Sequence, residues 1–552
     1  MLKDKLIELL NEAVKKAKGS GVIPAVDIPE ITIERPQKPE HGDYASNLPL
    51  KLARVAGKNP AIIAKEMVAL IPRIEEIEKV SFAPPGFINF TMKNSWLGLQ
   101  VENIRQAGDK FGNNNSGREK KIQVEFVSIN PTGPLHAGHG RGAILGSTLA
   151  NVLAVSGYEV QKEYYFNDAG NQMDAFKKSL YARYSQQFGV KREIPENGYY
   201  GEYIVDMAKE IVAAQGDKFL KLPEAEGIAG IGEIGLKRVI ELIKTELSQL
   251  GVVYDEWFSE QSLYKGGQYR KVLEILRKGG HLAEKDGATW FVSTALGEDK
   301  DNVVIRSDGS PGYFAADIAY HYNKFVERGF DKVIDIWGAD HQGHVSRLKT
   351  VVGAMGIDPS RLHIIIHQMV TMKRGGEVVR ISKRSGDLIT LKDVMEEVGV
   401  DACRFFFLAR SANSQMDFDL ELAKKQSQDN PVYYIQYAHA RISSILRLAK
   451  EKNINFDNGD TTLLFTAPEM TLIRKLIQFP EIIEIITATL EPHHLAYYAQ
   501  ELAIIFNQFY KDCRVITEDV PLTMGRLKLV QTSQIVLART LHLMGMTAPE
   551  TM

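Results

Sequence analysis

The sequence predicts an α/β protein in which a parallel β-sheet is covered by helices, with a smaller α+β region before it and an all-helical region after it. Three observations lead to this expectation. A strand pattern, a Gly- and Pro-rich loop and a long helix pattern follow one another between Lys121 and Val155. A second strand–helix–strand succession runs through residues 331–370. From Asp429 onward the pattern is helical throughout. Strands that alternate with helices typically build a parallel sheet.

Length and composition narrow the class of protein. The 552 residues exceed what one hydrophobic core usually holds, so two to four domains are expected. No apolar run approaches the ~20 residues of a membrane span, and the first residues resemble an amphipathic helix, so we expect no membrane contact and a cytoplasmic location. The two cysteines, Cys403 and Cys513, are too isolated for a CxxC metal site. A net charge of -2 does not suggest nucleic acid, so any RNA binding must use local basic patches.

The first domain is expected over residues 1–112. Helical patterns there mix with short strands, and EKVSFAPPGFINFTM (78–92) is typical of a strand, a Pro-Pro-Gly turn and a second strand. The polar, turn-rich stretch GNNNSGREKK (112–121) then reads as a linker.

The second domain is expected over residues 118–428 and carries the Rossmann-type sheet. Its first strand begins at Lys121 and is followed by a helix over about 137–155 and a strand over 158–166, which together make a βαβ unit. A charged, mostly helical insertion is expected at about 185–265. The second half of the sheet follows, and a helical third domain is predicted over 429–552.

The loop after the first strand, NPTGPLHAGHG (130–140), is the first candidate site. Ligands of α/β proteins bind at the carboxyl ends of the strands, and the positive N-terminal end of the next helix suits a phosphate. His136 and His139 are three residues apart and share a face of the first helical turn, from which they could donate hydrogen bonds to a triphosphate. The alternatives are a metal pair, for which no third ligand lies nearby in sequence, or two ordinary surface histidines.

This loop resembles the His-Ile-Gly-His signature of class I aminoacyl-tRNA synthetases, with Ala137 in the second position. Its place directly after the first Rossmann strand makes the resemblance specific. The resemblance implies that this segment binds ATP through four residues, with the two histidines catalytic: Pro134, His136, Gly138 and His139.

A second segment, RGGEVVRISKRSG, resembles the Lys-Met-Ser-Lys-Ser signature of the same class. The resemblance implies that Arg380, Ser382 and Lys383 bind ATP on a mobile, glycine-flanked loop, and that Lys383 is catalytic. Its ammonium would stabilise the pentavalent phosphorus as pyrophosphate leaves. Arg380 stands where the family has its first lysine, which keeps the charge but changes reach and geometry. A solvated basic turn is the alternative.

The resemblance is closest to arginyl-tRNA synthetases and spans nearly the whole chain. Four segments carry it: VEFVSINPTGPLHAGHGRG (124–142), GYFAADIAY (312–320), WGADHQGH (337–344) and GVDACRFFFLARS (399–411).

This resemblance implies a set of arginine-binding residues: Glu125, Asn130, Tyr313, Asp317, His341 and Gln342. The chemistry agrees, because a guanidinium needs carboxylates and an aromatic face. Asp317 would pair with the guanidinium, and Glu125 would take the α-ammonium or a side-chain N–H. The alternatives are that Glu125 only forms a salt bridge within the sheet and that Tyr313 only packs.

The flanking domains are expected to contact tRNA. The helical domain resembles an anticodon-binding bundle, where Tyr437 and Arg441 could stack on unpaired bases, although a tyrosine stripe at helical spacing is more often core. The N-terminal domain resembles the added domain that touches the D-loop at the tRNA elbow, with Phe87 and Asn89 as candidates. The alternative is that the phenylalanines are core and that Asn89 caps a turn.

The implied activity is ligation of L-arginine to its cognate tRNA. ATP with Mg²⁺ would be the co-substrate, without a structural metal, and the protein would be a monomer. Two alternatives remain: a synthetase for another amino acid, such as cysteine or glutamate, and a non-catalytic RNA-binding protein. A synthetase for cysteine would need zinc ligands that the chain lacks, and one for glutamate has no clear match in the pocket or C-terminal region. A non-catalytic RNA-binding descendant is disfavoured because both signatures keep their working residues.

Overall fold

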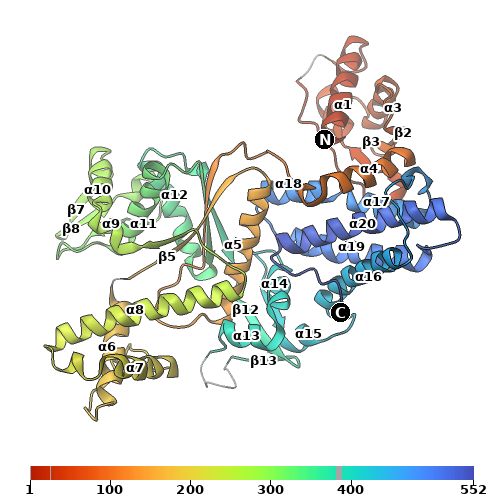
Figure 1. Ribbon diagram of the computed structural model, residues 1–552. Helices are drawn as coiled ribbons and strands as arrows, with labels where there is room; N and C mark the ends of the chain where they lie inside the picture. Colours follow the sequence, from red (N-terminus) through yellow and green to blue (C-terminus); the bar gives the residue numbers. More distant parts are fainter. Residues whose placement is uncertain (1, 25–26, 169, 381–387) are drawn as a thin grey trace. The chain divides into compact units, whose positions relative to one another are not determined.

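The computed structural model describes residues 2–24, 27–168, 170–380 and 388–552 (Figure 1). The chain divides into two compact units. The first comprises Met1–Phe111, Arg441–Gln478 and Ile504–Val536, and the second comprises Gly112–Ala440, Phe479–Ala503 and Leu537–Met552. Within the described residues, none of the helices combines the length and apolar character needed to span a membrane.

A five-stranded parallel sheet forms the centre of the second unit. The strand order is β11-β10-β4-β5-β6, and all neighbouring pairs are parallel. Its strands are β4 (Lys121–Phe126), β5 (Glu159–Phe166), β6 (Glu256–Ser259), β10 (Lys332–Gly338) and β11 (Leu362–His367). The central strand β4 is buried after its first residue, as expected for a parallel sheet covered on both faces. The predicted α/β fold class is confirmed.

Helix α5 (Ala137–Val155) connects β4 to β5, and it begins and ends where the sequence pattern predicts. Most of its residues are buried, which explains its nearly uniform apolar pattern. Helix α12 (Val345–Ala354) connects β10 to β11 in the same way. These are the two strand–helix–strand units that the sequence predicts for the two halves of the sheet.

The expected insertion at 185–265 is helical over most of its length. Helices α7 (Glu202–Gln215) and α8 (Glu224–Gln249) lie within it and pack on one another and on the preceding helix α6 (Asn171–Gln186). Its last residues differ from the expectation, because β6 adds an edge strand to the central sheet and α9 (Glu260–Lys265) follows. A strand of four residues is too short to show a period in the sequence.

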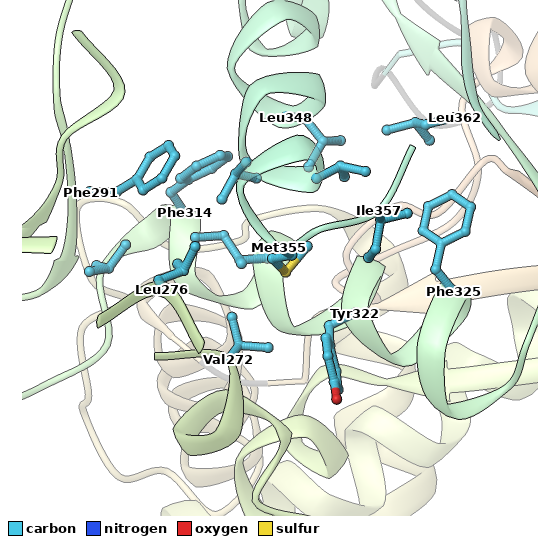
Figure 2. Packing of buried hydrophobic residues seen from close by; sticks show 14 of the residues in the cluster. Val272, Leu276, Phe291, Phe314, Tyr322, Phe325, Leu348, Met355, Ile357 and Leu362 are labelled. Carbon is cyan, nitrogen blue, oxygen red and sulfur yellow. The ribbon is translucent and has the colours of Figure 1, made fainter. Parts of the chain in front are cut away.

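A hydrophobic cluster fixes the helices on the β10–β11 side of the second unit (Figure 2). Helix α11 (Tyr313–Tyr322) contacts α10 (Gln268–Lys278), α12 and strand β9 (Asn302–Ile305), which forms a small antiparallel sheet with β7 (Leu282–Lys285) and β8 (Ala288–Phe291). Figure 2 shows Phe314 of α11 near Phe291 and Leu348, with Tyr322 lower on the same helix. The packing holds α11 in place, and α11 carries Asp317.

The rest of the second unit contains a mixed sheet, β13 (Glu377–Val378), β12 (Val370–Arg374) and β14 (Met416–Asp419). Short helices accompany it: α13 (Leu391–Val398), α14 (Val400–Leu408) and α15 (Leu420–Lys424). Helix α18 (Phe479–Thr489) packs on α5.

The first unit contains a three-stranded antiparallel sheet in the order β1-β3-β2. Strands β2 (Ile77–Ala83) and β3 (Phe87–Met92) form the predicted strand–turn–strand, and β1 is Tyr44–Ser46. Its helices are α1 (Leu2–Gly19), α2 (Leu48–Ala56), α3 (Pro60–Leu70), α4 (Asn94–Ala107) and α17 (Ala467–Leu476). An ion pair of 2.5 Å between Asp43 and Arg474 links the N-terminal sheet to α17.

The C-terminal region is helical, as predicted. Its long helices are α16 (Pro431–Glu451), α19 (His494–Asp512) and α20 (Val520–Leu543). Each of them contributes residues to both compact units.

Candidate active site

The first signature loop lies between β4 and α5. Val127 and Ser128 have φ angles of 70° and 42°, an unusual conformation for residues with side chains, and they turn the chain at the end of β4. His136 is the N-cap of α5, and its backbone N–H donates a hydrogen bond of 3.2 Å to His139 Nδ1. The centres of the two imidazole rings are 3.4 Å apart. The structure therefore brings the two predicted histidines into direct contact at the start of the helix.

Both histidines are held in the neutral form. Burial lowers the pKa of His136, and burial with the charges of His136 and His367 lowers the pKa of His139 to about 3. Because His139 Nδ1 accepts a hydrogen bond, the proton of its neutral ring resides on Nε2. Nε2–H is then the group that His139 can donate to a ligand.

The chain returns to this loop directly after the second signature. The Ala137 N–H donates to the Ile389 carbonyl at 2.9 Å, and the Leu391 N–H donates to the Leu135 carbonyl at 2.8 Å. Arg380 is exposed beyond β13, whereas Ser382 and Lys383 lie outside the described residues.

Sequence reasoning missed His367, at the end of β11. Its Nε2 lies 3.1 Å from the position that a Cβ on Gly142 would take, so it faces the first turns of α5. Burial and the nearby charge of Arg141 lower the pKa of His367 to about 4. A single histidine at the end of an apolar strand carries no signal in sequence that separates it from a core residue.

A buried charge cluster lies beneath the predicted arginine pocket. Lys324 is fully buried and its Nζ lies 2.5 Å from Glu125 and 2.8 Å from Asp335. Asp335 also accepts from His321 Nε2 at 2.9 Å. The structure thus shows Glu125 in the internal salt bridge that was its alternative interpretation, and whether it also contacts the substrate stays a prediction.

Asp317 lies on α11 at the edge of this cluster. Burial raises the pKa of its carboxyl group to about 6, with Glu260 and Glu125 adding to the rise and His321 and Arg347 opposing it. Asp317 is half-buried, whereas Glu260 is buried and accepts a hydrogen bond of 2.7 Å from the Tyr165 hydroxyl.

Across the described parts of the chain, no lysine or arginine forms an ion pair with Asp317 or Glu260. Lys324 and Arg328 are already paired with other buried acids. The pocket therefore has an excess of acidic groups and would favour a cationic ligand.

The other predicted arginine-binding residues lie around the carboxyl ends of β4 and β10. Asn130 is half-buried and donates to Gln172 Oε1 at 2.6 Å. His341 and Gln342 are exposed in the 3-10 turn Ala339–His344, directly after β10. Tyr313 is the first residue of α11, four positions before Asp317, and its side chain lies outside the description.

The predicted tRNA-contacting residues differ in their solvent exposure and in their contacts. Phe87 is half-buried on β3, but Asn89 is only 4% exposed on the same strand, so its burial favours the structural interpretation over a base contact. Tyr437 is 37% exposed on α16 and stacks on Tyr433. Arg441 donates to Asn507 at 2.7 Å and lies over the ring of Tyr510.

Three family models match this chain, and they follow one another along it. The N-terminal model, "Arginyl tRNA synthetase N terminal domain", matches residues 4–92. The model "tRNA synthetases class I (R), catalytic domain" matches residues 100–417, and "DALR anticodon binding domain" matches 435–552. An arginine–tRNA ligase of Dehalococcoides mccartyi is 58% identical over 551 residues, which cover 100% of this chain and 99% of that protein. The chain belongs to the arginyl-tRNA synthetase family.

Other arginyl-tRNA synthetases extend the likeness. An arginine–tRNA ligase of Heliobacterium modesticaldum is 48% identical and covers 98% of this chain and 97% of its own length. Among solved structures, the Thermus thermophilus arginyl-tRNA synthetase superposes with a TM-score of 0.80 at 23% identity, with both chains fully covered. That likeness shows the shared fold of the arginyl-tRNA synthetases.

Proposed function

We propose that this chain ligates L-arginine to its cognate tRNA in two steps. The arginine carboxylate attacks the α-phosphate of ATP, which gives arginyl-adenylate and pyrophosphate. The terminal ribose of the tRNA then attacks the mixed anhydride and releases AMP. The observation that carries the proposal is the pair of backbone hydrogen bonds that join the first signature loop to Ile389 and Leu391, just after the second signature, in a chain whose relatives are arginine–tRNA ligases.

The arginine side chain would bind against Asp317. The acidic excess of the pocket supports this assignment, because a guanidinium supplies the cation that the pocket lacks. Asn130, Tyr313, His341 and Gln342 would complete the pocket around the substrate. Glu125 would act at its floor together with Lys324.

The triphosphate would lie at the start of α5. His136 and His139 would donate hydrogen bonds, and the helix N-terminus would add its positive dipole. Pro134 and Gly138 would line the nucleotide, while Arg380, Ser382 and Lys383 would close on it from the second signature. Mg²⁺ would arrive with ATP as part of the nucleotide substrate. Catalysis would consist of positioning and charge stabilisation, without a covalent enzyme intermediate.

The two flanking regions would bind the tRNA. Residues 1–112 would contact the elbow, with Phe87 as the better candidate because Asn89 is buried. Residues 429–552 would contact the anticodon, with Tyr437 and Arg441 as candidates. The enzyme would work as a monomer in the cytoplasm.

The decisive experiment is ATP–pyrophosphate exchange and aminoacylation with each of the twenty amino acids in the presence of tRNA. Exchange and charging with arginine alone are expected. Activity with another amino acid would overturn the assignment of the pocket, and binding of tRNA without any exchange would favour the non-catalytic alternative.

A further inference from the structure

We propose that the helical insertion is a working part of the catalytic centre, in which Glu246 of α8 and Tyr203 of α7 act as positioning residues for His136 and His139. This inference rests on the proposed function, since it takes the two histidines to bind the triphosphate of ATP.

The loop that carries the signature lacks regular structure of its own. Residues 127–135, all of which are described, form neither helix nor strand. A loop of this kind keeps a defined shape through hydrogen bonds to its backbone, including those from side chains of other segments. The insertion supplies two such side chains, Tyr203 from α7 and Glu246 from α8, and the preceding helix α6 adds a side-chain bond to Asn130.

Glu246 makes the bond nearest to the histidines. It is 2% exposed, and its Oε2 accepts a hydrogen bond of 3.0 Å from the Leu135 N–H. The Leu135 carbonyl accepts in turn from the Leu391 N–H at 2.8 Å. Leu135 is thus held from both sides, immediately before the N-cap residue whose N–H orients the ring of His139.

Tyr203 holds the loop three residues earlier. Its hydroxyl donates to the Thr132 carbonyl at 2.7 Å. A Cβ on Gly133 would lie 3.1 Å from the Tyr203 hydroxyl oxygen, so the ring packs closely against the loop backbone. From α6, Gln172 adds a further bond of 2.6 Å by accepting from Asn130.

The three bonds reach the loop at positions 130, 132 and 135, and they come from helices that pack on one another. A shift of the insertion would therefore move the backbone that places His136. Misplacing a catalytic group by about 1 Å costs up to about 100-fold in rate, so these bonds have kinetic weight.

The test compares four variants, each with its kinetics in ATP–pyrophosphate exchange and its melting temperature. Glu246→Leu removes the acceptor, Glu246→Gln keeps an oxygen that can accept from Leu135, and Tyr203→Phe removes only a hydroxyl. Tyr200→Phe is the matched control, because Tyr200 is an exposed tyrosine of the same insertion whose hydroxyl donates to Pro195 instead of the loop.

The expected result is a selective defect. Glu246→Leu and Tyr203→Phe should lower kcat or raise KM for ATP by about 10- to 100-fold, with KM for arginine unchanged. Glu246→Gln should recover most of the activity, and Tyr200→Phe should behave like the unaltered protein. Equal loss in all kinetic constants together with a lower melting temperature, without recovery by Glu246→Gln, would overturn the proposal in favour of a purely structural role.

Hydrogen–deuterium exchange separates this inference from the proposed function. Peptides that cover residues 127–140 should exchange faster in Glu246→Leu and Tyr203→Phe, whatever the catalytic role of the loop. Unchanged exchange would overturn the premise that Glu246 and Tyr203 hold the loop in place. Faster exchange with unaltered kinetics would overturn the positioning role. The proposed function fails separately if His136→Ala and His139→Ala retain full adenylation.

Discussion

Asp317 is expected to change its protonation when L-arginine binds. Burial raises the pKa of this carboxyl group to about 6, from an ordinary value of 3.8. A guanidinium placed against the group would favour its charged form and lower its pKa. Near pH 6 the free protein should therefore hold a proton on Asp317 in about half of the molecules, and binding of arginine should release it.

The raised pKa of Asp317 also determines how Asp317→Asn should change the free energy of unfolding. A rise of about two pH units corresponds to about 3 kcal/mol. Because the folded pKa lies above the unfolded one, the stabilising contribution is fully present below about pH 3.8 and is lost as the pH rises through about 6. Above pH 6 the desolvated carboxylate is a cost to the free protein, which asparagine removes. Asp317→Asn should thus raise the free energy of unfolding at pH 8 by up to about 3 kcal/mol.

Asp317→Asn should weaken arginine binding, although it should stabilise the folded protein. Losing one partner of a desolvated charge pair costs about 2–4 kcal/mol, so Asp317→Asn should weaken arginine binding by that amount, with little change for ATP. In the unaltered protein, KM for arginine should rise as the pH falls below about 6, because the protonated carboxyl no longer attracts the cation.

Titration calorimetry in two buffers of different ionisation enthalpy measures the released proton directly. About half a proton should be released per bound arginine at pH 6, and almost none at pH 8. Asp206→Asn, an exposed acid of the insertion, is the matched control and should leave both quantities unchanged. A proton balance that does not depend on pH, or an equal loss of ATP and arginine binding in Asp317→Asn, would refute this account.

Three further predictions concern catalysis and stability. Lys383→Ala should lower the rate of adenylation by about 100-fold without changing arginine affinity, and an unaltered kcat would remove Lys383 from the mechanism. His136→Ala and His139→Ala should each slow adenylate formation with an unchanged circular dichroism spectrum, whereas activity that depends on added Zn²⁺ would indicate the metal alternative. Lys324→Met should lower the free energy of unfolding by about 3–5 kcal/mol, because it removes the buried cation from Glu125 and leaves Asp335 with His321 alone. Urea denaturation measures that loss, and a change below about 1 kcal/mol would show that the cluster relaxes.

Local sequence patterns predicted the central sheet well, because its strands and helices have strong physical signals. The helix expected over 137–155 is α5, and the strands that flank it were expected within a few residues of β4 and β5. Buried parallel strands are continuous apolar runs, and α5 is bounded by a Pro- and Gly-rich loop and a glycine turn. The strands β6 to β9 were not predicted, since each has only four residues and their pairing depends on distant partners.

The candidate site likewise contains residues that local sequence patterns predict and residues that they do not. His136 and His139 are close in sequence, so their spacing predicted a shared face that the structure confirms. Glu246 reaches the same loop from 111 residues away, and Lys324 reaches Glu125 from 199 residues away. No periodicity encodes such pairs, because they depend on how α8 and the segment after α11 pack on the sheet.

A buried lysine, Lys324, lies among the acidic residues near Asp317. It lies in a π-helical turn, Asn323–Glu327, a rare distortion that often occurs at functional sites. Its ammonium, together with Arg328, takes up the charge of Glu125, Glu163 and Asp335, which would otherwise repel one another and the ionised form of Asp317. Burial raises the pKa of Asp317 only to about 6, so its carboxylate predominates at neutral pH. Among the described residues, Lys324 is thus already paired with Glu125 and Asp335, whereas Asp317 and Glu260 have no ion pair, and Asp317 stays the predicted partner of the guanidinium.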